Sequence, residues 1–218
     1  TAPPQRTAPP PRTALLVLRD GTRRLSNVDE VGRFLGRWVS RGLVPGASHH
    51  RVVRPGRMSF CEQVAAFGGA RLVLGFSGAD LANALWMGDD AALVELFTLT
   101  FTRTAYGRTT PVDGAWLDAT EPNDFSAYLG RLGRPYVAAY VTEPALIQGG
   151  RPLVGDRKCA AHSAYYYSSR CVHVVRLEPL RLAMLRARGL LLAHDDAARA
   201  QPRAATSEGV TSRDGGRM

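Results

Sequence analysis

The chain has 218 residues, 45% of them hydrophobic, and a formal net charge of +9. This length and this hydrophobic content are enough for one substantial core. The charge itself excludes little, because Lys158 is the only lysine among 28 basic residues. A partner that needs only positive charge would accept lysine as readily as arginine, so the arginine excess points first to a GC-rich coding sequence.

The cysteine content and the apolar stretches limit the compartment. Cys61, Cys159 and Cys171 are too few for a disulfide framework and leave at least one thiol free. No apolar stretch approaches the roughly 20 residues that cross a bilayer. We therefore expect a protein without a membrane span in a reducing compartment, the cytoplasm or the nucleus. Secretion after the removal of a signal stays open, because the chain begins at Thr1.

The two ends of the chain differ in composition from its centre. Residues 1–12 contain five prolines in a polar setting, which predicts an extended tail. Residues 195–218 lack apolar periodicity, which predicts a second flexible tail. Residues 13–194 contain no internal repeat and should form a single globular domain.

The first predicted elements are a strand and a helix. The apolar run Ala14–Leu18 predicts a buried strand. Ser26 and Asp29 have the spacing of a capping box, which predicts a helix start. Apolar residues then recur at helical spacing through Val31–Val39, and Gly42 should end the helix.

The middle of the chain alternates between strand and helix patterns. Phe67–Gly69 is typical of a turn, and the apolar run Leu72–Phe76 predicts a strand. Two helices are predicted at Asp80–Met87 and Ala91–Leu96, followed by a threonine-rich strand at Leu99–Thr104.

The last predicted elements repeat this alternation. We expect a short helix at Asp124–Leu132 and strands at Tyr136–Val141 and Val172–Leu177. A final helix at Leu180–Leu192 has Pro179 in its first turn, where proline is tolerated.

Together these elements predict an α/β or α+β fold. The connections at 103–116 and 144–162 are long for a regular doubly wound sheet. We therefore expect a single domain in which helices pack on a mixed β-sheet, with flexible N- and C-terminal tails.

The interval from Val31 to Cys61 has no acidic residue and six basic ones. The basic residues are Arg33, Arg37, Arg41, Arg51, Arg54 and Arg57. The first three are spaced by four and should lie along one edge of the predicted helix. Guanidinium groups bind oxyanions in a bidentate way, so this interval predicts a binding surface for an acidic protein or a nucleic acid. The alternative is an ordinary solvated helix face.

A second cluster of reactive side chains surrounds Lys158. Cys159, His162, Cys171 and His173 are the types of residue that bind zinc tetrahedrally. Zinc is therefore one cofactor that the sequence allows. A nucleophilic Cys–His pair and ordinary strand or loop residues are the alternatives.

The end of the first predicted strand contains a third motif, Arg19-Asp20-Gly21-Thr22-Arg23. It resembles the Arg-x-Asp-x-Arg start of arginine-specific ADP-ribosylating toxins. The resemblance implies that Arg19 binds NAD and that Ser77 stands where that family has a Ser-Thr-Ser strand. The chain departs from the family elsewhere, because it contains no Ser-Thr-Ser and no Glu-x-Glu or Gln-x-Glu after it.

These patterns lead to two hypotheses of different classes. The first is a non-enzymatic regulatory or host-interaction protein of a GC-rich bacterium or a large DNA virus, which binds an acidic partner through its arginine-rich interval. The alternative is a divergent NAD-dependent ADP-ribosyltransferase-like enzyme or another transferase, which uses Arg19 or the cluster from Cys159 to His173.

Overall fold

The computed structural model describes residues 12–20, 24–98, 116–117, 133–144, 146–147, 151–152 and 172–200. Five neighbouring parallel strands form most of its main sheet, in the order β3-β1-β4-β5-β7, with β3 at one edge. Their bounds are β1 (Arg12–Val17), β3 (Ala47–Val53), β4 (Ala70–Phe76), β5 (Ala92–Thr98) and β7 (Tyr136–Pro144).

Shorter strands extend this sheet and make it mixed. Both β10 (Val172–Val175) and β6 (Trp116–Leu117) run antiparallel to β7, and β2 (Arg24–Leu25) pairs with β10. The strands β8 (Leu146–Ile147) and β9 (Arg151–Pro152) form a separate two-stranded sheet. The predicted mixed sheet in a single α/β domain is therefore confirmed.

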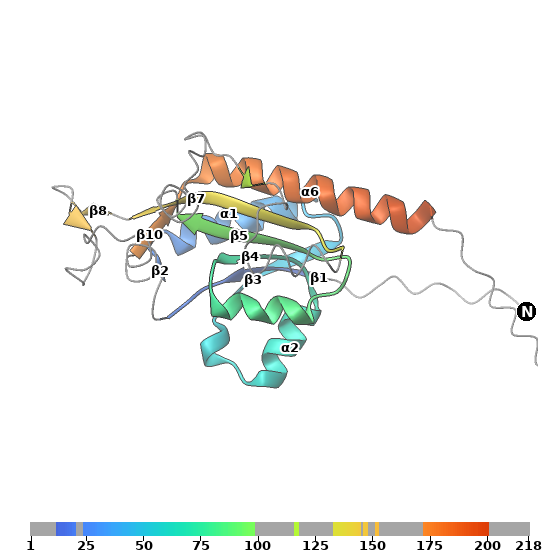
Figure 1. Ribbon diagram of the computed structural model, residues 1–218, viewed down its shortest axis with the longest axis horizontal. Coiled ribbons are helices and arrows are strands. Elements are labelled where there is room, and N and C mark those ends of the chain that lie inside the picture. Colours follow the sequence, from blue (N-terminus) through green and yellow to red (C-terminus); the bar gives the residue numbers. More distant parts are fainter. Residues whose placement is uncertain are drawn as a thin grey trace, which may run out of the picture.

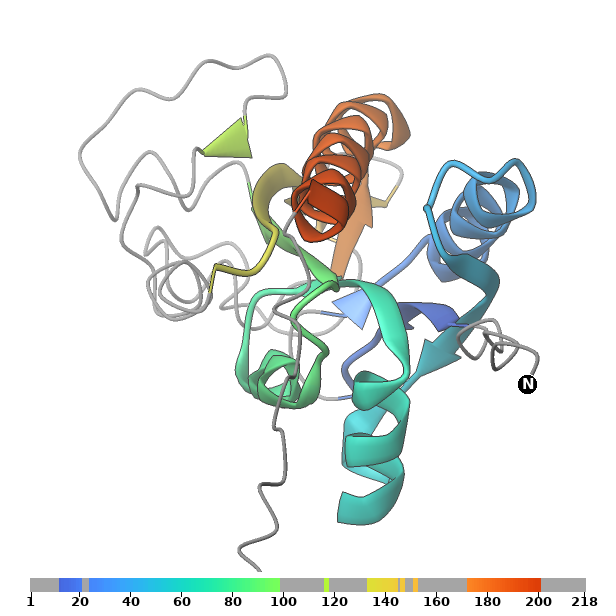
Figure 2. The same cartoon turned by 90° about the vertical axis from the view of Figure 1, so that its right-hand side faces the viewer.

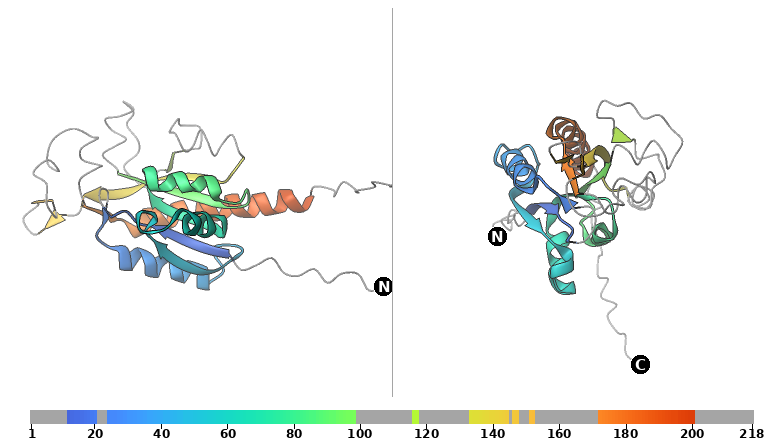
Figure 3. Two further views of the ribbon diagram at one scale, coloured as in Figure 1. Left: turned by 90° about the horizontal axis from the view of Figure 1, so that it is seen from below. Right: turned by 90° about the vertical axis from the view of Figure 1, so that its left-hand side faces the viewer.

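Helices cover both faces of the sheet (Figures 1 and 2). On one face lie α1 (Val28–Ser40) and α6 (Leu177–Ala200). On the other face α2 (Phe60–Gly68) and η2 (Ala79–Trp86) lie side by side, as the view from below in Figure 3 shows. A single turn, η1 (Pro55–Arg57), precedes α2. No described helix combines the length and the apolar character that a membrane span requires.

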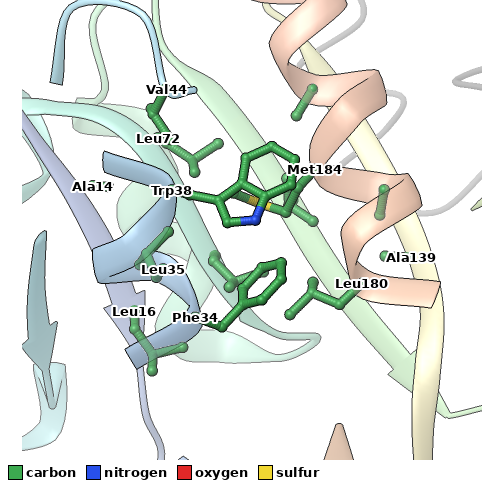
Figure 4. Packing of buried hydrophobic residues seen from close by; sticks show 14 of the residues in the cluster. Ala14, Leu16, Phe34, Leu35, Trp38, Val44, Leu72, Ala139, Leu180 and Met184 are labelled. Atoms are coloured by element: carbon green, nitrogen blue, oxygen red, sulfur yellow. The ribbon is translucent and has the colours of Figure 1, made fainter. Parts of the chain in front are cut away.

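The core under α1 and α6 is built around two aromatic rings of α1. Phe34 and Trp38 lie with their ring centroids 5.6 Å apart and point toward Leu180 and Met184 of α6 (Figure 4). These side chains, with Leu72 of β4, are buried. The spacing of four residues between Phe34 and Trp38 places both on one side of the helix, so the apolar stripe read from the sequence is the stripe that packs.

The core under α2 and η2 uses the alternate residues of the same strands. Leu15 of β1, Val73 of β4 and Leu93 of β5 point to this face, where they meet Phe67 of α2 and Leu81 of η2. All seven residues of β4 are buried, because helices cover the sheet on both sides.

Six of the predicted elements are present, and all of them except α6 have only small shifts at their ends. They are the strands β1, β4, β7 and β10 and the helices α1 and α6. The predicted helix Asp80–Met87 is the 3-10 helix η2. Helix α6 continues to Ala200 and so includes Asp195, where the predicted C-terminal tail begins.

Two other predictions about secondary structure are wrong. Residues Ala91–Leu96 form no helix; all but Ala91 belong to β5, which hydrogen-bonds to β4 on one side and β7 on the other. The edge strand β3 was not predicted. The predicted turn Phe67–Gly69 is the end of α2 and its cap, and α2 starts with a capping box formed by Ser59 and Glu62.

The start of α1 is one residue later than the capping pattern indicates. Asn27 precedes the helix, and its amide group exchanges two hydrogen bonds with the backbone of Val175 in β10. These bonds, of 2.9 and 3.0 Å, attach the start of α1 to the antiparallel side of the sheet. The predicted strand Leu99–Thr104, helix Asp124–Leu132 and most of both tails lie outside the described residues.

A buried arginine joins three segments at the amino ends of the parallel strands. The side chain of Arg71, at the start of β4, is 3% exposed. Its Nε donates to the carbonyl of Pro45 at 2.8 Å, and its Nη2 donates to both carboxylate oxygens of Asp195 at 2.6 Å. Its Nη1 donates to the carbonyl of Asp90 and forms an ion pair with the Asp90 carboxylate at 3.0 Å. Arg71 therefore attaches the loop after α1 and the last turns of α6 to the sheet.

The Arg71→Ala variant should be less stable than the wild type by about 2–4 kcal/mol, because several acceptors lose their partner in a buried position. Asp195 and Asp90 are 25% and 46% exposed and can regain water, so a larger loss is not expected. Urea unfolding followed by circular dichroism measures the difference. In the control variant Arg199→Ala, which removes an exposed ion pair with Asp196, the free energy of unfolding should be nearly unchanged. Equal effects of the two substitutions would contradict this role of Arg71.

Candidate functional site

The order of the strands places a topological switch point between β1 and β4. From β1 the chain continues to α1 on one face of the sheet, whereas from β4 it continues to η2 on the opposite face. The two connections therefore diverge at the carboxyl ends of neighbouring parallel strands. In open α/β sheets this is the position where ligands bind. We use "switch point" for the residues that directly follow β1 and β4.

Arg19 connects the two sides of the switch point. Its Nε lies 3.1 Å from an oxygen of Asp80, and its Nη1 donates to the carbonyl of Ser77 at 3.4 Å. The side chains of Arg19 and Asp80 are 18% and 27% exposed, so both groups still reach solvent. The structure thus brings together the two predicted catalytic candidates, Arg19 and Ser77. The contact is made by the backbone carbonyl of Ser77. Their catalytic role stays a prediction.

Two glycines allow the backbone to turn and pack closely at the switch point. Gly78 has φ 150° and ψ −179°, a conformation that residues with a Cβ rarely adopt, and there the chain leaves β4 for η2. A Cβ on Gly75 would lie 2.8 Å from Leu81 and 3.0 Å from the Cβ of Val17. Glycine at position 75 therefore lets η2 approach the last residues of β1 and β4.

A second charged group lies at the ends of β1 and β3. The carboxylate of Asp20 accepts hydrogen bonds from Nε of Arg54 at 3.0 Å and from Nε and Nη2 of Arg57 at 2.6 and 3.0 Å. The hydrogen bond from Arg57 and the positive charges of both arginines hold the pKa of Asp20 below its usual value. The same pairing raises the pKa of Arg57. Asp20 follows Arg19 in the chain, so this cluster adjoins the switch point.

The other members of the arginine-rich interval lie elsewhere. Arg33, Arg37 and Arg41 are exposed along α1 and after its end, and Arg51 is exposed on β3. The structure therefore separates the six predicted partner-binding residues into an α1 group, Arg51, and the pair at Asp20. Whether any of them binds a partner stays a prediction.

A cavity of about 380 Å³ lies between α2 and the β1–β3 edge of the sheet. Arg51 lines it with His49, Thr13 and Glu62. The Thr13 hydroxyl lies 2.8 Å from Nε2 of His49, so the imidazole ring is held against β1. Neither Arg19 nor Asp80 lines this cavity, which is therefore distinct from the switch point.

The predicted zinc site cannot be built from the described residues. Cys159, His162 and Cys171 lie outside them, and of His173 only the backbone in β10 is described. Among the described residues, no group of three or more histidine, cysteine or acidic side chains could hold a metal ion. The zinc hypothesis stays a prediction.

Sequence reasoning missed the two acidic partners at this edge of the sheet, Asp20 and Asp80. Each follows the end of a parallel strand within four residues, and this position in the sequence is the signal that could have identified them. Their pairing with Arg54, Arg57 and Arg19 joins residues 34 to 61 positions apart, so it depends on the strand order.

Comparison with known proteins gives a functional class for this part of the chain. Residues 2–94 match the family model Glycosyltransferase 61. The match ends in β5 and contains β1, α1, β3, α2, β4 and η2, and therefore both sides of the switch point. It covers less than half of the chain, which is thus similar to this family over that region. A search of curated proteins found no match.

This match overturns the first functional hypothesis. The similarity to glycosyltransferases indicates an enzyme of the transferase class, so the prediction of a regulatory or host-interaction protein is wrong. The prediction rested on charge in an arginine-rich chain, and charge alone does not identify a function. The general alternative, a transferase, agrees with the match, whereas its ADP-ribosyltransferase form is not confirmed.

Substitution of Gly75 tests the close packing at the switch point. The Gly75→Ala variant should be less stable by about 1–3 kcal/mol, because the new methyl group meets the Cβ of Val17 and the end of Leu81. The matched control is Gly189→Ala in α6, where a Cβ meets nothing within 4 Å. That variant should be more stable by about 0.5–1 kcal/mol, because alanine favours the helix. Thermal and urea unfolding compare the two, and a Gly75→Ala variant as stable as wild type would contradict the packing argument.

Proposed function

We propose that this chain is a glycosyltransferase that binds the phosphate groups of an activated sugar donor at the switch point. The observation that carries the proposal is the position of Arg19, which lies across the carboxyl ends of β1 and β4 inside the region similar to Glycosyltransferase 61. A ligand at this edge of an α/β sheet would meet the Arg19 guanidinium first, because Arg19 spans the two diverging connections.

The chemistry of glycosyl transfer explains why cations are needed at this position. The bond between the anomeric carbon and the phosphate oxygen breaks, a bond to an acceptor oxygen forms, and the acceptor hydroxyl gives up its proton. The leaving nucleoside diphosphate takes the electron pair of the broken bond, so negative charge develops on it. Fixed positive groups stabilise such developing charge without having to reorganise.

The residues at the switch point provide suitable groups. Arg19 offers a planar fork of N–H donors, the geometry that matches phosphate oxygens. Its pairing with Asp80 orients this fork. The first residues of η2 follow Gly78 at the same edge, and the free N–H groups of a helix start also favour an anion.

The Arg19→Gln variant should lose donor turnover. With nucleoside-diphosphate sugars and a mixture of simple saccharides as acceptors, the wild type should release nucleoside diphosphate. In the variant, kcat/KM should fall roughly 100-fold, because the leaving group loses its charged partner. Arg19→Lys should recover only part of this loss, because lysine keeps the charge but lacks the fork.

Arg134→Gln is the matched control for this experiment. Arg134 also pairs with an aspartate, Asp89, and donates to the backbone carbonyl of Ala84, but it lies at the amino ends of the strands. This variant should keep the wild-type kcat/KM. Wild-type turnover in Arg19→Gln would place the donor phosphates elsewhere. Release of nicotinamide from NAD, with no turnover of any sugar nucleotide, would favour the ADP-ribosyltransferase alternative.

A further inference from the structure

Asp20 binds the two arginines in the manner of a bound oxyanion. Both of its carboxylate oxygens accept hydrogen bonds, and the three donors come from Arg54 and Arg57. Arginine binds carboxylate and phosphate through the same parallel N–H geometry. The carboxylate of Asp20 thus occupies a place with the shape and charge of a phosphate-binding site.

This cluster lies at the same edge of the sheet as the switch point. Arg54 follows β3 and Asp20 follows β1, the strand that lies between β3 and β4. Arg19 also follows β1, and adjacent strands are about 4.8 Å apart, so the ends of β1 and β3 are separated by roughly 5 Å. A donor diphosphate that contacts Arg19 would therefore also reach Arg54 and Arg57.

The pairing of Asp20 with the arginines is exposed and can exchange. The side chains of Asp20 and Arg54 are 38% and 39% exposed, and that of Arg57 is 69% exposed. Ion pairs in contact with water contribute little to stability, and Asp20 can turn toward solvent without being left buried and uncompensated. Arg71 behaves differently: it is 3% exposed, and its partners fix it inside the fold.

The charges determine the direction of such an exchange. Two arginines and one carboxylate leave a single net positive charge on the cluster. A diphosphate carries more negative charge than a carboxylate and can contact both guanidinium groups at once. We propose that Asp20 occupies the oxyanion site of Arg54 and Arg57 in the unliganded protein and that the donor diphosphate displaces it. This inference rests on the proposed function.

Asp20 then acts as an internal competitor that the ligand must replace. The competition reduces the affinity of the site for every anion, because each must first separate Asp20 from the arginines. A multiply charged diphosphate overcomes this cost more easily than a singly charged anion does. Asp20 would therefore help to select diphosphate-bearing ligands.

The Asp20→Asn variant tests the competition directly with inorganic pyrophosphate as the probe. Titration calorimetry of the full chain at constant ionic strength should show binding about tenfold tighter than in the wild type, because the competing charge is gone. The control Asp89→Asn makes the same change of charge and also frees an arginine, Arg134, but at the opposite edge of the sheet. Its affinity for pyrophosphate should equal that of the wild type.

A double variant, Asp20→Asn with Arg57→Gln, shows whether the gain in affinity for pyrophosphate depends on Arg57. It should bind pyrophosphate no more tightly than the wild type. Unchanged or weaker binding in Asp20→Asn would overturn the inference and assign Asp20 an orienting role instead. An equal gain in Asp89→Asn would also overturn it, because overall charge would then be the cause. So would the absence of pyrophosphate binding in every variant.

Failure of this inference and failure of the proposed function give different results. If Asp20→Asn shows no tighter binding while Arg19→Gln loses sugar-nucleotide turnover, glycosyl transfer stands and the competition does not. If Asp20→Asn binds pyrophosphate more tightly while the wild type turns over no sugar nucleotide, the competition stands and the glycosyltransferase proposal does not.

Discussion

The order of the strands in the parallel sheet determines where this protein can hold a ligand. Because β1 and β4 are neighbours and their connections leave toward opposite faces, the described helices α1 and η2 diverge at the carboxyl ends of these two strands. Arg19, Asp80 and Asp20 all follow these strands directly, so the backbone topology sets their neighbourhood. The similarity to glycosyltransferases covers this same part of the chain. The family match, which indicates the chemical class, and the strand order, on which the proposed position of the site rests, are separate observations.

The opposite edge of the sheet also has an arginine that pairs with aspartates, Arg71, but this arginine connects segments of the fold. Arg71 is enclosed by a loop, a turn and the last part of α6, and all of its donor groups bind acceptors within the fold. At the carboxyl edge the arginines keep access to solvent, and the acceptors of Arg54 and Arg57 are provided by one exposed aspartate. Loss of a partner would leave the buried charge of Arg71 uncompensated, whereas an exposed arginine can change its partner without that cost.

The sequence predicts the elements that have a single apolar face or a clear apolar run, and it fails where local pattern and tertiary position disagree. Helix α1 follows directly from its apolar periodicity, and strands β1 and β4 follow from their continuous apolar runs. The segment Ala91–Leu96 is rich in helix-forming residues, and its burial on both faces as β5 removes the alternation that marks a strand. The edge strand β3 has mostly exposed polar side chains and no apolar pattern. For α2 the capping box of Ser59 and Glu62 was a readable signal, but Phe67 is its only fully buried residue.

The same limit applies to the predicted site, because the density of charge along the sequence does not show which arginines the fold brings together. In a chain with 27 arginines, the longest acid-free interval predicted a binding surface that includes α1. The arginines of α1 lie exposed on a helix face. Arg19 lies outside that interval and directly before an acid, Asp20, yet it occupies the switch point. It became a candidate through the resemblance of Arg19–Arg23 to a toxin motif, and its place at the end of β1 is what the structure adds. Arg54 and Arg57 belong to the acid-free interval, but they are distinguished from the rest by Asp20, an acid 34 residues away. The arginines for which we propose phosphate binding are therefore distinguished from the others by their position at the strand ends, and only the order of the strands in the sheet determines that position.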